Sequence, residues 1–263
     1  MSQISAKDIQ SLRQLAGVGM MEAKRALEAA DGDIDAAMKA LREQGLAKAT
    51  ERADRDNAQG AIAIGRSGTA TAIVQIKCET DFVAKSDSFV ALVQAIADSV
   101  AEKGEAGVAD HQATFDQAKI SLKENIDLGR VVRFAAAADA IIDTYLHLQA
   151  GRGVNATMVE IKGGTDELAH DIALHIAFAR PKYLTRDEVP ADVVAAERDT
   201  LEQITRNEGK PEAALPKIVE GRIGGYFKQI CLMEQEFAKD NKQTIKAVVG
   251  TATITRFAQV EIG

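Results

Sequence analysis

Cysteine is scarce in this chain of 263 residues, which contains only Cys78 and Cys231. The two cysteines lie far apart, form no Cys-x-x-Cys motif and have no histidine at metal-binding spacing, so we expect reduced and mostly buried thiols. His170 and His175 are five residues apart and therefore do not share a helical face. These patterns predict no metal site and no bound cofactor.

The sequence also lacks long apolar runs, targeting signals and an excess of basic residues. No run approaches the ~20 apolar residues of a membrane-spanning helix, and the N-terminus has neither a secretion signal nor an Arg-rich transit pattern. The net charge is -7 and the pI is about 5.3, which does not favour binding to a nucleic-acid backbone. We expect a soluble cytoplasmic protein with no membrane contact and no direct nucleic-acid binding.

Common catalytic motifs are absent as well. There is no Walker loop, no GxGxxG after a strand, no HExxH, no GxSxG and no pair of acids that we place on one face. The chain does have apolar residues, at 46% of the total, which is enough for a substantial core in two or three units. We therefore expect a protein that works by binding another protein, and not an enzyme.

Residues 74–85, with the sequence VQIKCETDFVAK, contain the most informative pattern. Apolar and polar residues alternate over residues 74–77, which predicts a half-buried strand. Thr80 and Asp81 then offer side-chain oxygens to the first turn of a helix. Phe82 therefore lies at the junction of a strand and a helix.

A second copy of this pattern occurs eighty-five positions later, where residues 159–166 repeat the pattern of residues 74–81. Such self-similarity indicates two related strand-strand-helix units. The copies differ at Phe82, which Glu167 replaces in the second copy. A position that accepts glutamate is rarely buried, so Phe82 is a candidate exposed aromatic.

The sequence supports two interpretations of Phe82. One continuous helix from Thr80 would place Phe82 near the face of Phe89 and Ile96, in the core. Residues 86–88, with the sequence SDS, are cap formers that would instead end one helix and start another. Both interpretations remain open at this point.

The first fifty residues predict three short helices. The first begins at Ser5 with a capping-box pattern and breaks at Gly17, the second ends near residues 31–32, and the third runs from about Asp33 to Gly45. The first helix has an apolar face formed by Ile9, Leu12 and Leu15. The arrangement resembles the ubiquitin-associated (UBA) fold.

Met20 and Met21 follow the glycine loop of this module. Either methionine alone fits a core position, but two adjacent methionines on a helix indicate that at least one faces outward, where a flexible thioether suits a protein contact. Lys24 lies on the same side by helical spacing and is otherwise read as a solvated lysine.

The remaining chain predicts an α+β protein with an N-terminal three-helix UBA-like module, two related small antiparallel-sheet and helix subdomains, and an inserted antiparallel helical hairpin. We expect strands near residues 61–64 and 70–77 joined by the loop 65–68, a strand near 126–137, a hairpin near 145–162, a helix over 166–179 and a last strand over 252–260. The predicted domains are the module (1–52), a linker (53–60), the N-terminal core subdomain (61–139), the C-terminal core subdomain (140–182 and 229–263) and the hairpin, or coiled coil (183–228).

These motifs together make the chain similar to the translation elongation factor Ts (EF-Ts) family. The resemblance rests on residues 78–85 and 12–27, and continues through 125–126, 145–147, 171–177, 209–211 and 218–222. It covers nearly the whole chain in order.

The resemblance implies a guanine-nucleotide exchange factor for elongation factor Tu (EF-Tu), a GTPase of translation elongation. It implies that Asp81 and Phe82, within the motif Thr80 to Val83, reach the nucleotide-binding domain of the partner. Phe82 would wedge between two helices, disturb the Mg²⁺ and phosphate site, release GDP and allow GTP to load. The other implied partner-binding residues are Met20, Met21 and Lys24 in the module and His147 in the core.

Some positions depart from the family pattern. Ala16 and Ala23 replace the usual Thr and Cys, and Lys123 stands where a glycine often precedes Glu-Asn-Ile. The chain also ends at Gly263, so we expect the C-terminal helical extension of some members to be missing. Two other function classes stay open, an adaptor that binds ubiquitin-like or nascent segments and a small-molecule enzyme.

Overall fold

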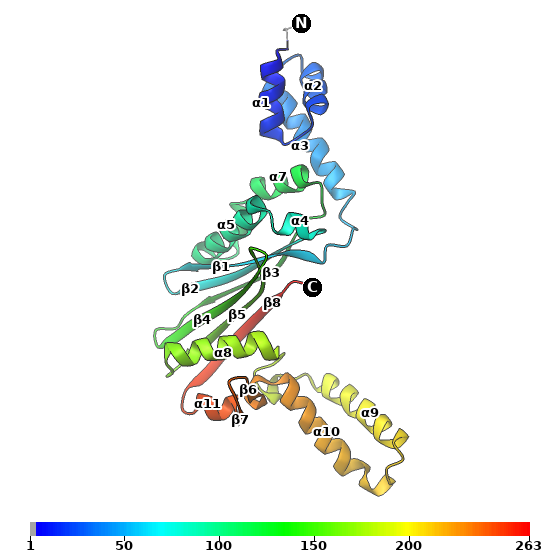
Figure 1. Cartoon of the computed structure of the whole chain (residues 1–263), viewed down its shortest axis with the longest axis vertical. Helices are drawn as coiled ribbons and strands as arrows, with labels where there is room; N and C mark the ends of the chain where they lie inside the picture. The colour runs from blue at the N-terminus through cyan, green and yellow to red at the C-terminus, as the bar shows by residue number, and fades with distance from the viewer. Residues whose placement is uncertain (1–3) are drawn as a thin grey trace. The chain divides into compact units, whose positions relative to one another are not determined.

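The computed structural model describes residues 4–263 and shows an α+β protein (Figure 1). Predicted boundaries that begin at Met1 therefore start outside the described residues. The chain divides into two compact units. Unit 1 comprises Met1–Ala135, Leu146–Ala156 and Val260–Gly263, and unit 2 comprises Ala136–Tyr145 and Thr157–Gln259. The finer division into module, linker, subdomains and hairpin stays a prediction.

Unit 1 contains most of the N-terminal half. Its helices are α1 (Ala6–Ala16), α2 (Met20–Ala29), α3 (Ile34–Thr50), α4 (Asp81–Ala84), α5 (Asp87–Lys103), α6 (Ala106–Ala109) and α7 (Gln112–Leu122). Its complete strands are β1 (Gln59–Ser67), β2 (Ala70–Cys78) and β3 (Asp127–Ala135). Three strands have residues in both units, namely β4 (Ala140–Gln149), β5 (Arg152–Lys162) and β8 (Thr253–Glu261).

Unit 2 contains the remaining elements. These are α8 (Asp166–Ala179), α9 (Ala191–Asn207), α10 (Leu215–Ile230), β6 (Glu236–Phe237), β7 (Asp240–Thr244) and α11 (Ile245–Val249), with short 3₁₀ turns at Arg186–Glu188, Glu212–Ala214 and Leu232–Glu234. Within residues 4–263, no helix is both long enough and apolar enough to cross a membrane.

The three predicted N-terminal helices are present, and local capping explains where they begin. Ser5 forms the capping box with Asp8 at the start of α1, and Gly17 ends that helix with φ 67°. The Asp33 side chain accepts hydrogen bonds from the amides of Asp35 and Ala36 at the start of α3. The core of this three-helix module consists of Leu12, Ala16, Ala23, Leu27, Ala37 and Leu41.

The prediction that the third helix ends at Gly45 is wrong, because α3 continues to Thr50. A Cβ atom on Gly45 would lie 2.7 Å from side-chain carbons of Ile120 in α7, so this glycine allows two helices to approach closely. The Gln117 side chain also donates to the carbonyl of Ala16 at 2.9 Å. Helix α3 and the end of α1 are therefore in direct contact with α7.

The β1–β2 hairpin of unit 1 is longer than predicted. Its register runs from Gln59 opposite Cys78 to Ser67 opposite Ala70, so the turn is confined to two residues. Gly65, predicted as part of the loop, lies inside β1. A Cβ there would be 2.1 Å from the carbonyl oxygen of Ala97 in α5, so the glycine is required by close packing of helix on strand.

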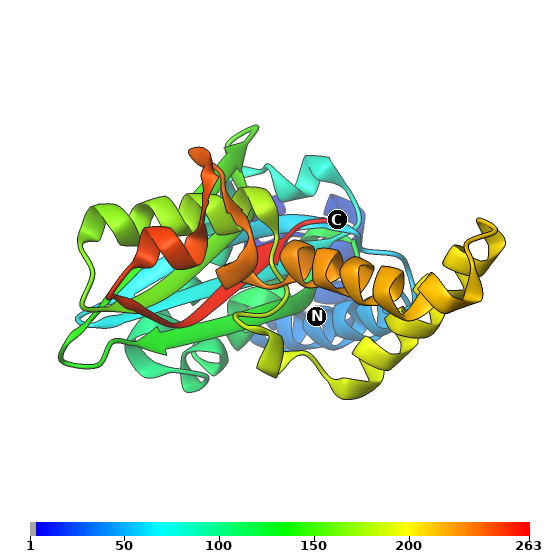
Figure 2. The same cartoon turned by 90° about the horizontal axis from the view of Figure 1, so that it is seen from below.

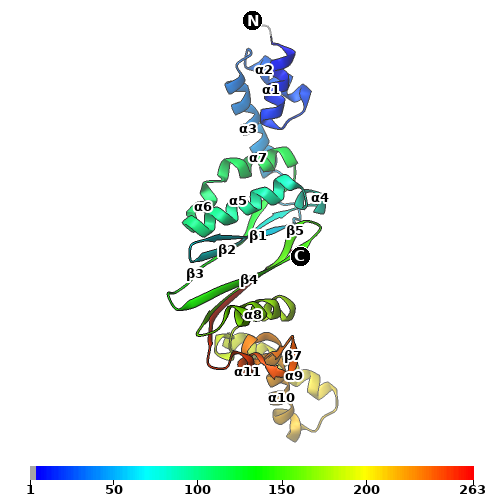
Figure 3. The same ribbon diagram turned by 60° about the vertical axis from the view of Figure 1, so that its left-hand side comes forward.

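Helix α5 covers one face of β1 and β2 (Figure 3) and buries the core of unit 1. The buried side chains of this layer include Val74 and Ile76 of β2 and Phe89 and Ile96 of α5. Because these residues alternate on β2 and repeat at helical spacing on α5, the sheet and the helix present matching apolar faces. The strand that precedes Phe82 is therefore fixed on a packed layer.

Unit 2 confirms the predicted helix over residues 166–179 and the antiparallel pair α9 and α10, which Figure 2 shows side by side. Pro216 lies in the first turn of α10, where the missing amide hydrogen of proline costs no helical hydrogen bond. Two separate sheets were expected, but hydrogen bonding connects the strands in the single order β3-β2-β1-β5-β4, with β8 paired to β5. A two-stranded β6–β7 sheet is an element that the sequence did not reveal.

Candidate functional site

The site is built on the corner where β2 ends and α4 begins. Thr80 has extended backbone angles (φ -117°, ψ 152°), and its hydroxyl accepts a hydrogen bond from the amide of Val83 at 3.3 Å. This is the N-cap that the sequence predicted. Ala84 is fully buried and Val83 packs against the core, so the short helix is anchored on its inner side.

Phe82 lies on the outer side of this corner with 76% of its surface exposed. Helix α4 ends at Ala84, and α5 begins at Asp87 after Ser86 in extended conformation. The Ser86 hydroxyl donates to the carbonyl of Val83 at 2.8 Å, which caps the end of α4. The alternative of one continuous helix with Phe82 in the core is therefore wrong.

Lys85 contacts both predicted partner-binding residues at the outer side of the corner. Its ammonium group lies 2.8 Å from a carboxylate oxygen of Asp81 and 4.8 Å from the centre of the Phe82 ring. The hydrogen bond from Lys85 lowers the pKa of the Asp81 carboxyl group. The corner thus presents an ionised carboxylate next to an aromatic ring.

Glu124 holds the inner side of the corner, and sequence reasoning did not identify it as a site residue. Its carboxylate accepts hydrogen bonds from the amides of Glu79 (3.0 Å) and Thr80 (3.1 Å) and from the Thr80 hydroxyl. The amide of the buried residue Asn125 donates to the Glu79 carboxylate at 2.6 Å. The only signal in the sequence was the Glu-Asn-Ile motif, which does not reveal a contact with residues about 45 positions earlier.

Cys78 is completely buried directly before the corner, and its thiol donates to the carbonyl of Thr80 at 3.3 Å. Burial raises the pKa of the Cys78 thiol to about 12 and that of Cys231 to about 11. Both cysteines are free and buried, as the sequence predicted. Their environment suits packing and not nucleophilic chemistry.

The predicted module residues lie on α2, in unit 1. Met20 and Met21 are 47% and 59% exposed, so both face outward. Lys24 forms an exposed ion pair with Glu28 at 3.6 Å. Leu15, predicted on one apolar face with Ile9 and Leu12, is 62% exposed, because Leu12 and Ala16 fill the core positions of α1.

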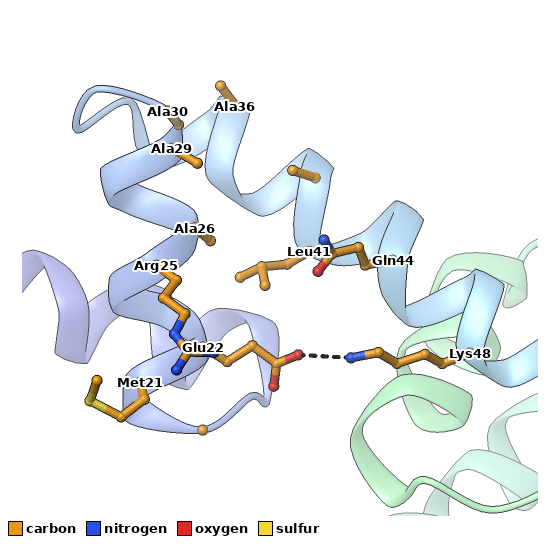
Figure 4. A pocket seen from close by; sticks show the side chains of 12 residues that line it. Met21, Glu22, Arg25, Ala26, Ala29, Ala30, Ala36, Leu41, Gln44 and Lys48 are labelled. Atoms are coloured by element: carbon orange, nitrogen blue, oxygen red, sulfur yellow. Dashed lines mark hydrogen bonds and ion pairs between the residues drawn. The ribbon is translucent and has the colours of Figure 1, made fainter.

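Met21 also borders an open groove between α2 and α3 (Figure 4). Alanine side chains and Leu41 form much of its lining, and the ion pair of Glu22 with Lys48 spans one end at 3.4 Å. His147 lies on β4 in unit 1 and is exposed, as is the next residue, Leu148. The partner-binding roles of the module residues and of His147 stay predictions.

Comparison with known proteins identifies the family of the chain. The family profile described as "Elongation factor TS" matches residues 79–263. "Elongation factor Ts" of Clavibacter michiganensis subsp. michiganensis is 44% identical over 281 aligned positions that cover 100% of both chains. The protein of the same name from Mycobacterium tuberculosis (strain ATCC 25177 / H37Ra) is 41% identical, with 100% of this chain and 99% of that protein covered. The chain therefore belongs to the elongation factor Ts family and is a translation elongation factor.

Proposed function

We propose that this protein is a guanine-nucleotide exchange factor that binds elongation factor Tu in the cytoplasm. It promotes release of GDP by disturbing the Mg²⁺ and phosphate site of the GTPase, and GTP then loads. The exposed ring of Phe82 on a fixed corner is the observation that carries the proposal. Membership of the elongation factor Ts family supports the identity of the partner.

The corner has the properties of a wedge. Phe82 is exposed, while Val83 and Ala84, which follow it in α4, are anchored in the core of the unit. A large aromatic side chain on a rigid support loses little conformational entropy on binding and contributes strongly to protein interfaces. Phe82 would insert between two helices of the nucleotide-binding domain, and Asp81 would contact the same domain.

The exchange follows from thermodynamic linkage. If the factor binds nucleotide-free partner more tightly than GDP-bound partner, it weakens GDP binding by the same ratio. A 10⁴-fold effect requires ~5.5 kcal/mol of differential binding energy. A central aromatic residue supplies about 2–4 kcal/mol of this, and distributed contacts supply the remainder.

Those distributed contacts include the module and the core. We assign Met20, Met21 and Lys24 to docking on the nucleotide-binding domain, because both methionines are exposed and adjacent to a lysine on one helix. The exposed His147 is assigned to a further contact of the core. The mechanism needs only binding energy, and no bond is made or broken.

The test is the rate at which labelled GDP leaves elongation factor Tu when a substoichiometric amount of this protein is added. We expect the natural chain to accelerate release and Phe82→Ala to lose most of the acceleration. Glu167→Ala, at the equivalent position of the second copy, is the control and should behave as the natural chain. No acceleration by the natural chain would refute the proposed function.

A further inference from the structure

Glu124 reaches the Phe82 corner from the end of another helix. Lys123 ends α7 in the left-handed conformation, with φ 59° and ψ 27°, and so turns the chain away from the helix axis. The next residue, Glu124, is half-buried, and Asn125 after it is buried. The contacts of Glu124 are made with residues 79 and 80, the last two before α4.

The chemistry of these contacts fixes the direction of each hydrogen bond. An ionised carboxylate only accepts, so the Thr80 hydroxyl must give its proton to Glu124. A lone pair of the same hydroxyl oxygen is then available to accept from the amide of Val83 at 3.3 Å. Both oxygens of Glu124 act as acceptors, one for the Thr80 hydroxyl and the other for the amides of Glu79 and Thr80, so a glutamine at this position would place a donor against one of these donors.

Asn125 extends this set of contacts to the segment after the three-helix module. Its side-chain amide donates to the carbonyls of Ala53 (3.0 Å) and Arg55 (2.7 Å). The Arg55 side chain in turn lies 3.5 Å from the Glu79 carboxylate. Two consecutive residues, Glu124 and Asn125, thus hold both the corner and the segment that joins α3 to β1.

We propose that Glu124 is a positioning residue for nucleotide exchange, which sets the direction of Phe82 by fixing the hydroxyl of Thr80. This inference rests on the proposed exchange function for its effect on rate. The geometric part, the ordering of α4 by Glu124, does not depend on that function. Glu124 acts through Thr80 and Phe82 and needs no contact with the partner.

The first experiment is a double-mutant cycle on the rate of GDP release from elongation factor Tu. Glu124→Gln keeps the size of the side chain but introduces a donor, and we expect it to reduce the acceleration about tenfold, as for the loss of one charge-assisted hydrogen bond. In a Phe82→Ala background the same substitution should have no further effect. Thr80→Ser keeps the hydroxyl group and should keep the acceleration of GDP release. Thr80→Val removes the hydroxyl group and should reduce the acceleration as much as Glu124→Gln does.

The second experiment measures deuterium uptake of the peptide that covers residues 79–86 in the full chain, without the partner. Glu124→Gln should increase uptake there and leave it unchanged over α5, with Glu105→Gln, an exposed acid of the same unit, as the matched control. Thermal unfolding reports whether each variant is folded. If Glu124→Gln does not fold, Thr80→Val takes its place in the experiment, because it removes the same hydrogen bond by changing the donor instead of the acceptor.

The outcomes separate the two proposals. If the natural chain fails to accelerate GDP release, the exchange function is wrong, and deuterium uptake still decides whether Glu124 orders the corner. Unchanged uptake over residues 79–86 in Glu124→Gln would overturn the positioning role. An equal loss of rate in the natural and Phe82→Ala backgrounds would also overturn it, because a general structural defect reduces activity in both.

Discussion

The two strand-to-helix corners of this protein begin in the same way and then diverge. Thr80 and Thr165 both cap a helix by accepting from the amide three residues later, at 3.3 and 3.2 Å. The first corner then has a helix of 4 residues, α4, whereas the second starts the 14-residue helix α8. The sequence explains the difference in helix length. Residues 86–88 are cap formers that end α4 and start α5, whereas the corresponding residues 171–173, Asp-Ile-Ala, continue α8 and the last two of them are buried.

The comparison indicates that the corner does not need an aromatic side chain at the position of Phe82. Phe82 and Glu167 occupy equivalent positions, and both are exposed. A glutamate is therefore sufficient for the second corner to form, and an aromatic ring at this position gains nothing from burial in the folded chain. Its exposure in one copy only is consistent with the proposed contact of Phe82 with elongation factor Tu.

The largest expected effect comes from exchanging these two residues. Phe82→Glu should reduce GDP release from elongation factor Tu by about 30- to 1,000-fold, the range for a loss of ~2–4 kcal/mol at an aromatic interface residue. Because the ring is exposed, the free energy of unfolding should change by less than about 0.5 kcal/mol. Glu167→Phe should leave both quantities unchanged, and a comparable loss of rate in that variant would contradict the distinction between the corners.

Removing the two caps should have unequal effects on stability. Thr165→Val should lower the free energy of unfolding by about 1 kcal/mol, the usual cost of a lost N-cap. Thr80→Val should cost about 2 kcal/mol, because Glu124 also loses the donor at its half-buried carboxylate. Urea unfolding monitored by circular dichroism measures both, and equal losses would show that Glu124 adds nothing to the first cap.

Stability should depend on pH through His175, which is buried on α8, the helix of the second corner. Its Nε2 lies 3.0 Å from the Gln235 side-chain oxygen, and its Nδ1 accepts from the amide of Ala238 at 3.2 Å, so both ring nitrogens are satisfied in the neutral form. Burial lowers the pKa of His175 below its usual 6.5.

The unfolded chain then binds this proton at a higher pH than the folded chain does. The His175 contribution to stability is therefore present above pH 6.5 and is lost as the pH falls below that value towards the lowered folded pKa. Unfolding free energies measured between pH 7.5 and about 5 should decrease less steeply in His175→Gln than in the natural chain. An identical slope would exclude His175 as a source of acid sensitivity.

The smallest effect concerns the hairpins before the two corners. Ala150 has φ 52° in the β4–β5 turn, while Gly68 has φ 55° in the β1–β2 turn. Ala150→Asn creates the Asn-Gly pair preferred in such turns and should stabilise the chain by about 0.5 kcal/mol. Gly68→Ala should destabilise it by about 1 kcal/mol, and thermal unfolding of both variants measures the contrast.

Local signals in the sequence predicted the elements that local interactions determine. The caps at Ser5, Thr80 and Thr165 were readable because each depends on residues within three positions. The glycines at positions 45 and 65 were misread as helix and strand ends, because their function is to admit Ile120 and the backbone of α5, which are distant in sequence. Long-range packing overrode their usual meaning as breakers.

The candidate site shows the same limit. Phe82 was identified from the motif and from comparison of the two copies, but its exposure needed the structure, because the helical spacing also allowed a core position. Glu124 was missed because three hydrogen bonds converge on it from residues 79 and 80, and no periodicity in the sequence reports such convergence.

Because Cys78 is buried directly before the corner, its chemical modification can be used to measure local unfolding of the corner. Burial raises the pKa of the Cys78 thiol to about 12, so the thiol is protonated at pH 7, and the sulfur is shielded from solvent. Alkylating reagents should therefore modify Cys78 only in molecules whose corner has transiently unfolded. The rate of that modification measures how often the support beneath Phe82 comes apart.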